Sequence, residues 1–285
     1  NGTVVDGLGG DDTFDLNPQP FDNLEIGDGG AVTLIGNSGN DTFDFGNATG
    51  FQVIVGQSTG GEGTITGDEG DDVFQALDGV IIGWTGEGTL LGGSGDDAFD
   101  LRWAQLGISP AGKGVVDGGT GNDTIAFGQA GGNGAAIGIL GQATVSGGNG
   151  DDTIALTSGS EVGASFFSSS TTGTVSGGAG NDSIFFATLS QLGGSSRGLG
   201  LGGAGDDVFS FADNSNIGEE ERGTLDAGSD NDTILMSDGS DVGESGSGQG
   251  TILGGQGNDT VAMSSGSEMG RGSSGMIDGG DGDDV

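Results

Sequence analysis

The sequence predicts an all-β chain folded as a parallel β-solenoid, with about ten coils of 25–31 residues and three short strands in each coil. Three observations predict this fold class. A glycine-rich acidic turn recurs eleven times, apolar residues occupy fixed columns between the turns, and 70 glycines among 285 residues disfavour helices throughout. Stacked coils of this kind each bury an apolar face against the next coil.

The acidic turn is the most regular feature of the chain. Its sixth position is aspartate in every copy, and successive copies follow one another at steps of 25–31 residues. The eleven copies are GLGGDDTF (7–14), GNSGNDTF (36–43), GDEGDDVF (67–74), GGSGDDAF (92–99), GGTGNDTI (118–125), GGNGDDTI (147–154), GGAGNDSI (177–184), GGAGDDVF (202–209), AGSDNDTI (227–234), GGQGNDTV (254–261) and GGDGDDV (279–285).

Apolar columns flank each turn. The first column lies two residues before the turn and the second closes it, always nine residues later. The first column is Val5, Leu34, Ile65, Leu90, Val116, Val145, Val175, Gly200, Leu225, Ile252 and Ile277, and the second is Phe14, Phe43, Phe74, Phe99, Ile125, Ile154, Ile184, Phe209, Ile234 and Val261. A third column precedes a glycine and consists of Ile26, Val55, Ile82, Leu106, Ile137, Val162, Leu192, Ile217, Val242 and Met269. Coil length varies only in the segments before and after this third column, whereas the acidic turn keeps the same length in every copy. Because surface loops tolerate insertions, a turn of constant length indicates that a specific interaction holds its geometry.

The spacing of apolar residues beside the turn indicates strands. Pairs such as Ile154 and Leu156 have the period of two that is typical of a half-buried strand. Gly200 interrupts the first column, and we expect its neighbours Leu199 and Leu201 to compensate for the missing side chain.

Composition excludes several functions. The chain has 43 acidic and 5 basic residues, a net charge of −38, so phosphate contacts to nucleic acid are not expected and anionic membrane surfaces should repel it. No apolar run approaches the ~18 residues of a membrane span, so we expect no membrane insertion. Cysteine, histidine and tyrosine are absent, Lys113 is the only lysine, and we expect no enzymatic activity.

The turn pattern G-G-x-G-x-D-x-U, in which U is apolar, resembles the calcium-binding nonapeptide of the repeats-in-toxin (RTX) family over the whole chain. The resemblance implies that turn carbonyls and the sixth-position aspartates coordinate Ca²⁺ between stacked turns. These aspartates are Asp12, Asp41, Asp72, Asp97, Asp123, Asp152, Asp182, Asp207, Asp232, Asp259 and Asp284. The family's usual coil carries a nonapeptide on both sides, whereas this chain has one turn per coil, so we expect one row of about ten ions along one edge.

The residues also favour calcium without the resemblance. Calcium takes six to eight hard oxygen ligands in loose geometry, and glycines allow a turn to direct its carbonyls inward. Carboxylates stacked every ~4.8 Å repel one another unless counter-ions separate them. About ten Ca²⁺ ions would change the net charge from −38 to about −18.

A metal-free turn is the alternative. Asn, Asp and Gly are ordinary turn formers, and ladders of Asn and Asp side chains can stabilise solenoid corners without an ion. Among the departures from the pattern, Asp230 stands at a glycine position in 227–234, and 7–14 lacks the second glycine. We expect these two turns to be the weakest sites.

Residues 1–285 are expected to form a single uncapped repeat array, either a segment of a longer chain or a filament subunit. We expect a secreted or cell-surface structural protein, such as a fibre, surface layer or adhesin stalk. Its expected partners are calcium, other copies of the chain through end-to-end self-association, and a cell-surface or matrix polysaccharide. The alternative is a calcium-dependent folding or secretion module, or a carbohydrate-binding module, of a secreted enzyme.

A partial column of threonines raises the alternative of an ice-binding face. This column is Thr33, Thr64, Thr89, Thr144, Thr174, Thr224 and Thr251. The position two residues later is a mixture of Asp, Ser, Leu and Ile with a single threonine, Thr66, so no regular T-x-T face is expected.

Overall fold

The computed structural model describes residues 2–17, 23–46, 52–76, 79–102, 104–128, 134–164, 171–244 and 247–285. Within these ranges every regular element is a strand, and no helix could cross a membrane. Strands from successive coils pair in parallel and form three sheets, one for each side of the coil. The sequence-based prediction of a parallel β-solenoid is therefore confirmed.

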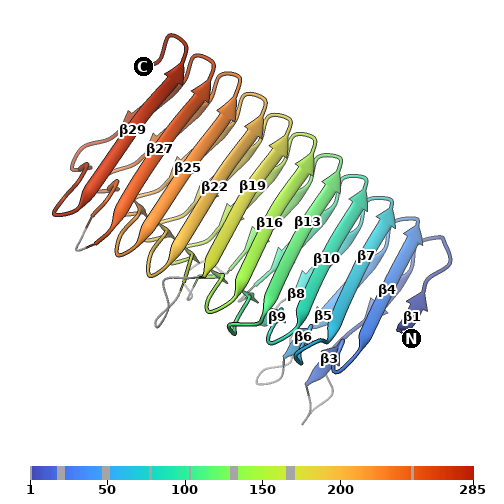
Figure 1. Cartoon of the computed structure of the whole chain (residues 1–285). Helices are drawn as coiled ribbons and strands as arrows, with labels where there is room; N and C mark the ends of the chain where they lie inside the picture. Colours follow the sequence, from blue (N-terminus) through green and yellow to red (C-terminus); the bar gives the residue numbers. More distant parts are fainter. Residues whose placement is uncertain are drawn as a thin grey trace.

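The first sheet contains the first apolar column and has eleven strands in the described residues. They are β1 (Thr3–Asp6), β4 (Ala31–Ser38), β7 (Glu62–Glu69), β10 (Glu87–Ser94), β13 (Lys113–Thr120), β16 (Gln142–Asn149), β19 (Thr172–Ala179), β22 (Arg197–Ala204), β25 (Arg222–Ser229), β27 (Gln249–Gln256) and β29 (Ser274–Asp281). Figure 1 shows these strands side by side in chain order, with the two termini at opposite ends of the solenoid.

The second sheet contains the second apolar column and has ten strands in the same part of the chain. They are β2 (Thr13–Asp15), β5 (Thr42–Gly46), β8 (Val73–Ala76), β11 (Ala98–Leu101), β14 (Thr124–Phe127), β17 (Thr153–Leu156), β20 (Ser183–Phe186), β23 (Val208–Phe211), β26 (Thr233–Met236) and β28 (Thr260–Met263).

The third sheet is the shortest, with eight strands among the described residues. They are β3 (Leu24–Ile26), β6 (Val53–Val55), β9 (Val80–Ile82), β12 (Gln105–Leu106), β15 (Ala136–Ile137), β18 (Glu161–Val162), β21 (Gln191–Leu192) and β24 (Asn216–Ile217). Beyond β24, Val242 and Met269 continue this side only as isolated bridges. Three strands in every coil is therefore correct for most of the chain but not for its last coils.

The core fills the inside of the tube. Outside the terminal coils, the apolar residues of all three columns are buried in one continuous cluster, and the register places like residues on one another. The rings of Phe43, Phe74 and Phe99 stack with centroids 4.8 and 4.4 Å apart. Each coil therefore completes the hydrophobic surface of its neighbour, which is how a stacked repeat gains stability.

Two details differ from the sequence-based expectation. The first three residues of most acidic turns lie within the long strands of the first sheet, as at Gly92 to Ser94 in β10, because the strands continue pairing into the motif. The gap at Gly200 is filled from neighbouring elements, since a Cβ there would lie 2.9 Å from Leu225 Cδ1 and 3.3 Å from Leu192 Cδ2. Leu199 and Leu201 alternate to the outer face of β22 and do not fill it.

Candidate metal centre

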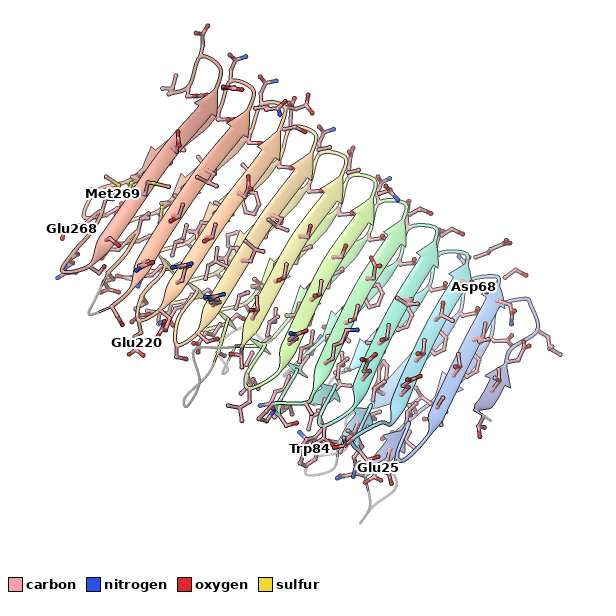
Figure 2. The ribbon with its side chains drawn as sticks, in the orientation of Figure 1. Glu25, Asp68, Trp84, Glu220, Glu268 and Met269 are labelled. Atoms are coloured by element: carbon pink, nitrogen blue, oxygen red, sulfur yellow. The ribbon has the colours of Figure 1, made fainter. Side chains whose placement is uncertain are left out.

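The acidic turns form one edge of the solenoid, where each first-sheet strand passes into the second sheet. Figure 2 places Asp68, the second residue of its turn, at this edge, whereas Trp84, Glu220 and Glu268 lie at the opposite edge. Nine residues separate the first and second columns in every copy, so the sixth-position aspartates occupy the same place in each coil. The structure thus brings together in one row the aspartates that the sequence singled out.

The sixth-position aspartates, called the inner aspartates below, are mostly buried although the turns that carry them lie at an edge of the solenoid. The nine from Asp41 to Asp259 have 0–1% of their surface exposed. Asp12 in the first coil is half-buried and Asp284 in the last is exposed. Burial of so many carboxyl groups is costly unless each has a partner for its charge or its hydrogen-bonding oxygens.

One oxygen of each inner aspartate has such a partner. The main-chain N–H of the inner aspartate in one coil donates to Oδ1 of the inner aspartate in the next coil, with lengths of 2.7–3.0 Å. Asp72 N–H, for example, donates to Asp97 Oδ1 at 2.7 Å. This inner ladder runs without interruption from Asp12 to Asp284.

The fifth residue of each turn forms a second ladder in the opposite direction. Here the N–H of each coil donates to Oδ1 of the preceding coil, with lengths of 2.8–3.1 Å. This outer ladder consists of Asp11, Asn40, Asp71, Asp96, Asn122, Asp151, Asn181, Asp206, Asn231, Asn258 and Asp283, all exposed. Both Asn and Asp occur in it, because both supply the Oδ1 acceptor. The Nδ2 groups of Asn181, Asn231 and Asn258 also donate to the Oδ1 of the preceding coil.

The glycines of the motif have two different roles. The second and fourth positions have positive φ, 120° at Gly93 and 135° at Gly95, so glycine avoids backbone strain there. Leu8 and Asp230 take positive φ of 79° and 81° at these positions, so the two irregular turns keep the same backbone path. The first position has no positive φ, and glycine is needed there for space.

That space lies between two oxygens of different coils. A Cβ on Gly92 would lie 2.2 Å from Asp97 Oδ2 and 2.3 Å from the carbonyl oxygen of Gly118 in the next coil. The same pair of contacts recurs at Gly36, Gly118, Gly202 and Gly254. These five coils therefore hold a carboxylate oxygen and a backbone carbonyl oxygen close to a space without a side chain.

The second oxygen of the inner aspartates has no hydrogen-bond partner in the described residues. These buried Oδ2 atoms belong to Asp12, Asp41, Asp72, Asp97, Asp123, Asp152, Asp182, Asp207, Asp232 and Asp259. A buried carboxylate oxygen without a donor requires a cation or a proton beside it. The residues therefore fit a row of oxygen-liganded cations, with one aspartate and the surrounding turn carbonyls as donors at each site.

Burial raises the pKa values of several of these carboxyl groups. Desolvation, reinforced by neighbouring acids, raises the pKa of Asp97, Asp207 and Asp232 to about 7. It raises the pKa of Asp72, Asp123, Asp152 and Asp182 to about 6. Without a cation, the row would thus be partly protonated near neutral pH, which removes the repulsion between adjacent carboxylates.

The carboxylates do not form clusters. Within the described ranges no three His, Cys, Asp or Glu side chains come together as a metal site. Each candidate site must draw its remaining ligands from backbone carbonyls, which is the donor set that the sequence predicted. The assignment of the eleven aspartates as calcium ligands stays a prediction, and the two ladders are the feature that the metal-free alternative anticipated.

Sequence reasoning missed a shorter polar column at the third corner. Asp241 is 2% exposed, and its Oδ1 accepts a 2.7 Å hydrogen bond from Glu268 N–H. Its own N–H donates to Asn216 Oδ1 at 2.9 Å, and its Oδ2 lies 3.7 Å from Arg271 Nη1. Arg271 supplies counter-charge to Asp241 and also lies within 4.0 Å of carboxylate oxygens of Glu244 and Glu268. The residues before the third apolar column could have revealed it, since Asn216, Asp241 and Glu268 are successive members.

Comparisons with known proteins give limited similarity. No family model matches the chain, and no curated protein matches it. Among solved structures, a hyperactive, Ca²⁺-dependent, β-helical antifreeze protein from an Antarctic bacterium is similar with a TM-score of 0.44 and 18% identity, over 97% of this chain and 82% of that one. A fragment of TibA, hyper-glycosylated by TibC, has a TM-score of 0.18 and 11% identity over 96% of this chain and 97% of that one. Neither similarity bears on what the turns bind, which must be inferred from the chain's own residues.

Proposed function

We propose that this chain is a calcium-binding structural repeat protein of the extracellular space, in which a row of about ten Ca²⁺ ions joins each acidic turn to the next. The observation that supports this most directly is the row of buried, unpartnered Oδ2 atoms. They lie at the one corner whose length never varies. A free carboxylate oxygen repeated in successive coils fits a divalent cation better than a turn that needs only its own hydrogen bonds.

The chain's residues would divide the task between them. The inner aspartates supply a negative oxygen, the first-position glycines leave room beside it, and the positive-φ glycines orient the turn carbonyls. When bound, calcium would supply positive charge between oxygens that otherwise repel. In the folded stack the inner ladder fixes each Oδ1, and this also positions Oδ2 as a ligand.

The proposed location follows from this chemistry. Extracellular calcium modules bind at about 10⁻⁴–10⁻³ M, so the sites would fill outside a cell and stay metal-free in the cytosol. At a concentration 100 times the Kd, each site would add about 2.7 kcal/mol to the free energy of unfolding. We therefore expect a poorly ordered chain without calcium and a rigid rod with it, as suits a fibre, surface layer or adhesin stalk.

Circular dichroism during a calcium titration, combined with the number of ions bound, tests this proposal. We expect strand signal to appear with calcium, to disappear with chelator, and to accompany about ten ions per chain. Magnesium at equal concentration is the control, because it demands a smaller octahedral site and gives up its waters reluctantly. Full strand signal in chelator with no bound calcium would contradict the proposal.

Ice binding is not favoured by the surface of the first sheet. Thr33 pairs with Thr64 in an outward column, as expected, but the same column contains Val115, Leu199 and Met276. Such a column lacks the regular polar lattice that the sequence analysis required. A thermal-hysteresis assay with calcium present should therefore show no activity.

A further inference from the structure

The turn at 227–234 differs from all others at its first position, the position that borders the space beside Oδ2 of the inner aspartate. Ten of the eleven copies begin with glycine, whereas the turn at 227–234 begins with Ala227. Ala227 is 0% exposed, and its strand pairs in register with the strands on both sides, through Gly203–Gly228 and Gly228–Gly255. The alanine methyl group is therefore inside the turn edge and not turned out to solvent.

The neighbouring turns show what that methyl group displaces. A Cβ on Gly202 would lie 2.0 Å from the carbonyl oxygen of Ala227 and 2.4 Å from Asp207 Oδ2. A Cβ on Gly254 would lie 2.2 Å from the carbonyl oxygen of Gly279 and 2.4 Å from Asp259 Oδ2. At both positions a methyl group would enter the space between the carboxylate oxygen and the next coil's carbonyl.

In the coil between these two, the methyl group is present. Asp232 is 1% exposed and its Oδ2 is buried without a hydrogen-bond partner in the described residues, as in the other coils. The inner ladder nevertheless passes through this coil, because Asp207 N–H donates to Asp232 Oδ1 and Asp232 N–H to Asp259 Oδ1. The coil thus keeps its place in the stack but differs from its neighbours in the space beside Oδ2.

The same turn carries a second departure. Asp230 takes the place of the fourth-position glycine at a φ of 81°, a region that costs non-glycine residues free energy. Its exposed carboxylate approaches Ser229 Oγ at 3.4 Å and does not enter the inner row. Asp230 therefore does not supply a substitute ligand where the Ala227 methyl group occupies the space beside Asp232.

We infer that the Ala227 methyl group blocks the cation site of Asp232, so that the calcium row is divided into a long run from Asp12 to Asp207 and a short run beginning at Asp259. This inference rests on the proposed function. The divided row has a physical consequence, because residues 254–285 are joined to the preceding coil by hydrogen bonds and apolar contacts but not by an ion at this rung. They form the part of the rod that opens first as calcium falls.

The number of calcium ions bound at saturation tests the inference. Equilibrium dialysis followed by metal analysis would be applied to the full chain, to A227G and to A204G. Ala204 is the matched control, because it is the third residue of its turn and its side chain is exposed. We expect A227G to bind one more ion per chain than wild type and A204G to bind the same number.

A reverse variant keeps the test independent of A227G. G118A places a Cβ at 2.2 Å from Asp123 Oδ2 and 2.5 Å from the carbonyl oxygen of Gly147, so it should bind one ion fewer than wild type. Thermal unfolding at limiting calcium gives a second readout, and A227G should merge an early transition with the main one.

The outcomes separate this inference from the proposed function. Equal ion counts in wild type and A227G, both near ten, would overturn the inference and leave the proposed function standing. A count that rises in D230G but not in A227G would assign the block to Asp230 and overturn the inference as stated. No calcium bound by wild type would overturn both.

Discussion

The main-chain N–H of Asp72 donates a 2.7 Å hydrogen bond to Oδ1 of Asp97 in the next coil, while Oδ2 of Asp97 is buried without a partner among the described residues. The same carboxyl group thus has one oxygen fixed by the fold and one left for a ligand. Repetition of this arrangement makes the acidic edge a row of half-satisfied carboxylates. Its behaviour should depend on what neutralises the second oxygen.

Replacing one inner carboxylate should have opposite effects with and without calcium. D97N keeps the Oδ1 acceptor for Asp72 N–H but removes the buried charge. With calcium at 100 times the Kd, the variant should lose one ion and about 2.7 kcal/mol of unfolding free energy. Without calcium it should be more stable than wild type, because one buried, mutually repelling carboxyl group is gone. Denaturant unfolding in both conditions measures this.

The matched control is D96N, one residue away. Asp96 Oδ1 accepts the N–H of Asn122 at 2.8 Å in the exposed outer ladder, and asparagine serves the same role in other coils. We expect little change in either condition. A loss of calcium stability in D96N equal to that in D97N would show that general negative charge, and not the inner oxygen, holds the ions.

The metal-free protein should become more stable on acidification. Burial raises the pKa of Asp97 and Asp207 to about 7, above the ordinary value of 3.8 that applies in the unfolded chain. Between about pH 4 and 7 the folded chain therefore holds protons that the unfolded chain has released, and the free energy of unfolding falls as pH rises. This contribution is fully present below pH 4 and lost above pH 7.

The residual strand signal of the calcium-free chain, recorded by circular dichroism across this pH range, checks the sign, because the folded fraction should fall as pH rises. The same series with saturating calcium should show the reverse trend, because calcium needs the deprotonated carboxylate. Stability of the metal-free chain that increases from pH 4 to 7 would contradict the raised pKa values.

Calcium binding should release protons. If the inner carboxyl groups are partly protonated near pH 6.5, each ion that binds must displace the proton fraction that its aspartate holds. Titration calorimetry at pH 6.5 in two buffers of different ionisation enthalpy should show net proton release, which should vanish at pH 8.5. Equal binding enthalpies in both buffers at pH 6.5 would argue against protonated sites.

Loss of a core ring should weaken the protein regardless of calcium. Phe74 is fully buried between Phe43 and Phe99, so F74A should cost about 3–5 kcal/mol with calcium bound. The number of ions bound should not change as long as the variant is folded. F74L, which leaves a smaller cavity, should cost less. A drop in ion number in folded F74L would show that the core and the ion row are not separable.

The sequence was sufficient for the architecture because each coil repeats one pattern. Column spacing predicted which residues stack, and Phe43, Phe74 and Phe99 do so in register. The sequence also placed the inner aspartates in one row, since a turn of constant length returns Asp97 and Asp123 to equivalent positions.

Other features depend on atomic positions that spacing does not encode. Which carboxylate oxygen is used by the ladder, and the opposite directions of the two ladders, follow from side-chain rotamers in a folded turn. The filling of the gap at Gly200 by Leu192 and Leu225 depends on packing across sheets, which a search along the strand for compensating residues cannot detect. The effect proposed for Ala227 depends on the space beside Gly202 and Gly254, which residue spacing does not encode.

Anomalous diffraction from a crystal grown in calcium would test the central claim most directly. The account predicts a single row of calcium peaks along the acidic edge, one coil apart, each in contact with the Oδ2 of an inner aspartate such as Asp97 or Asp123. A map in which those oxygens contact no ion, although the solenoid is intact, would contradict it.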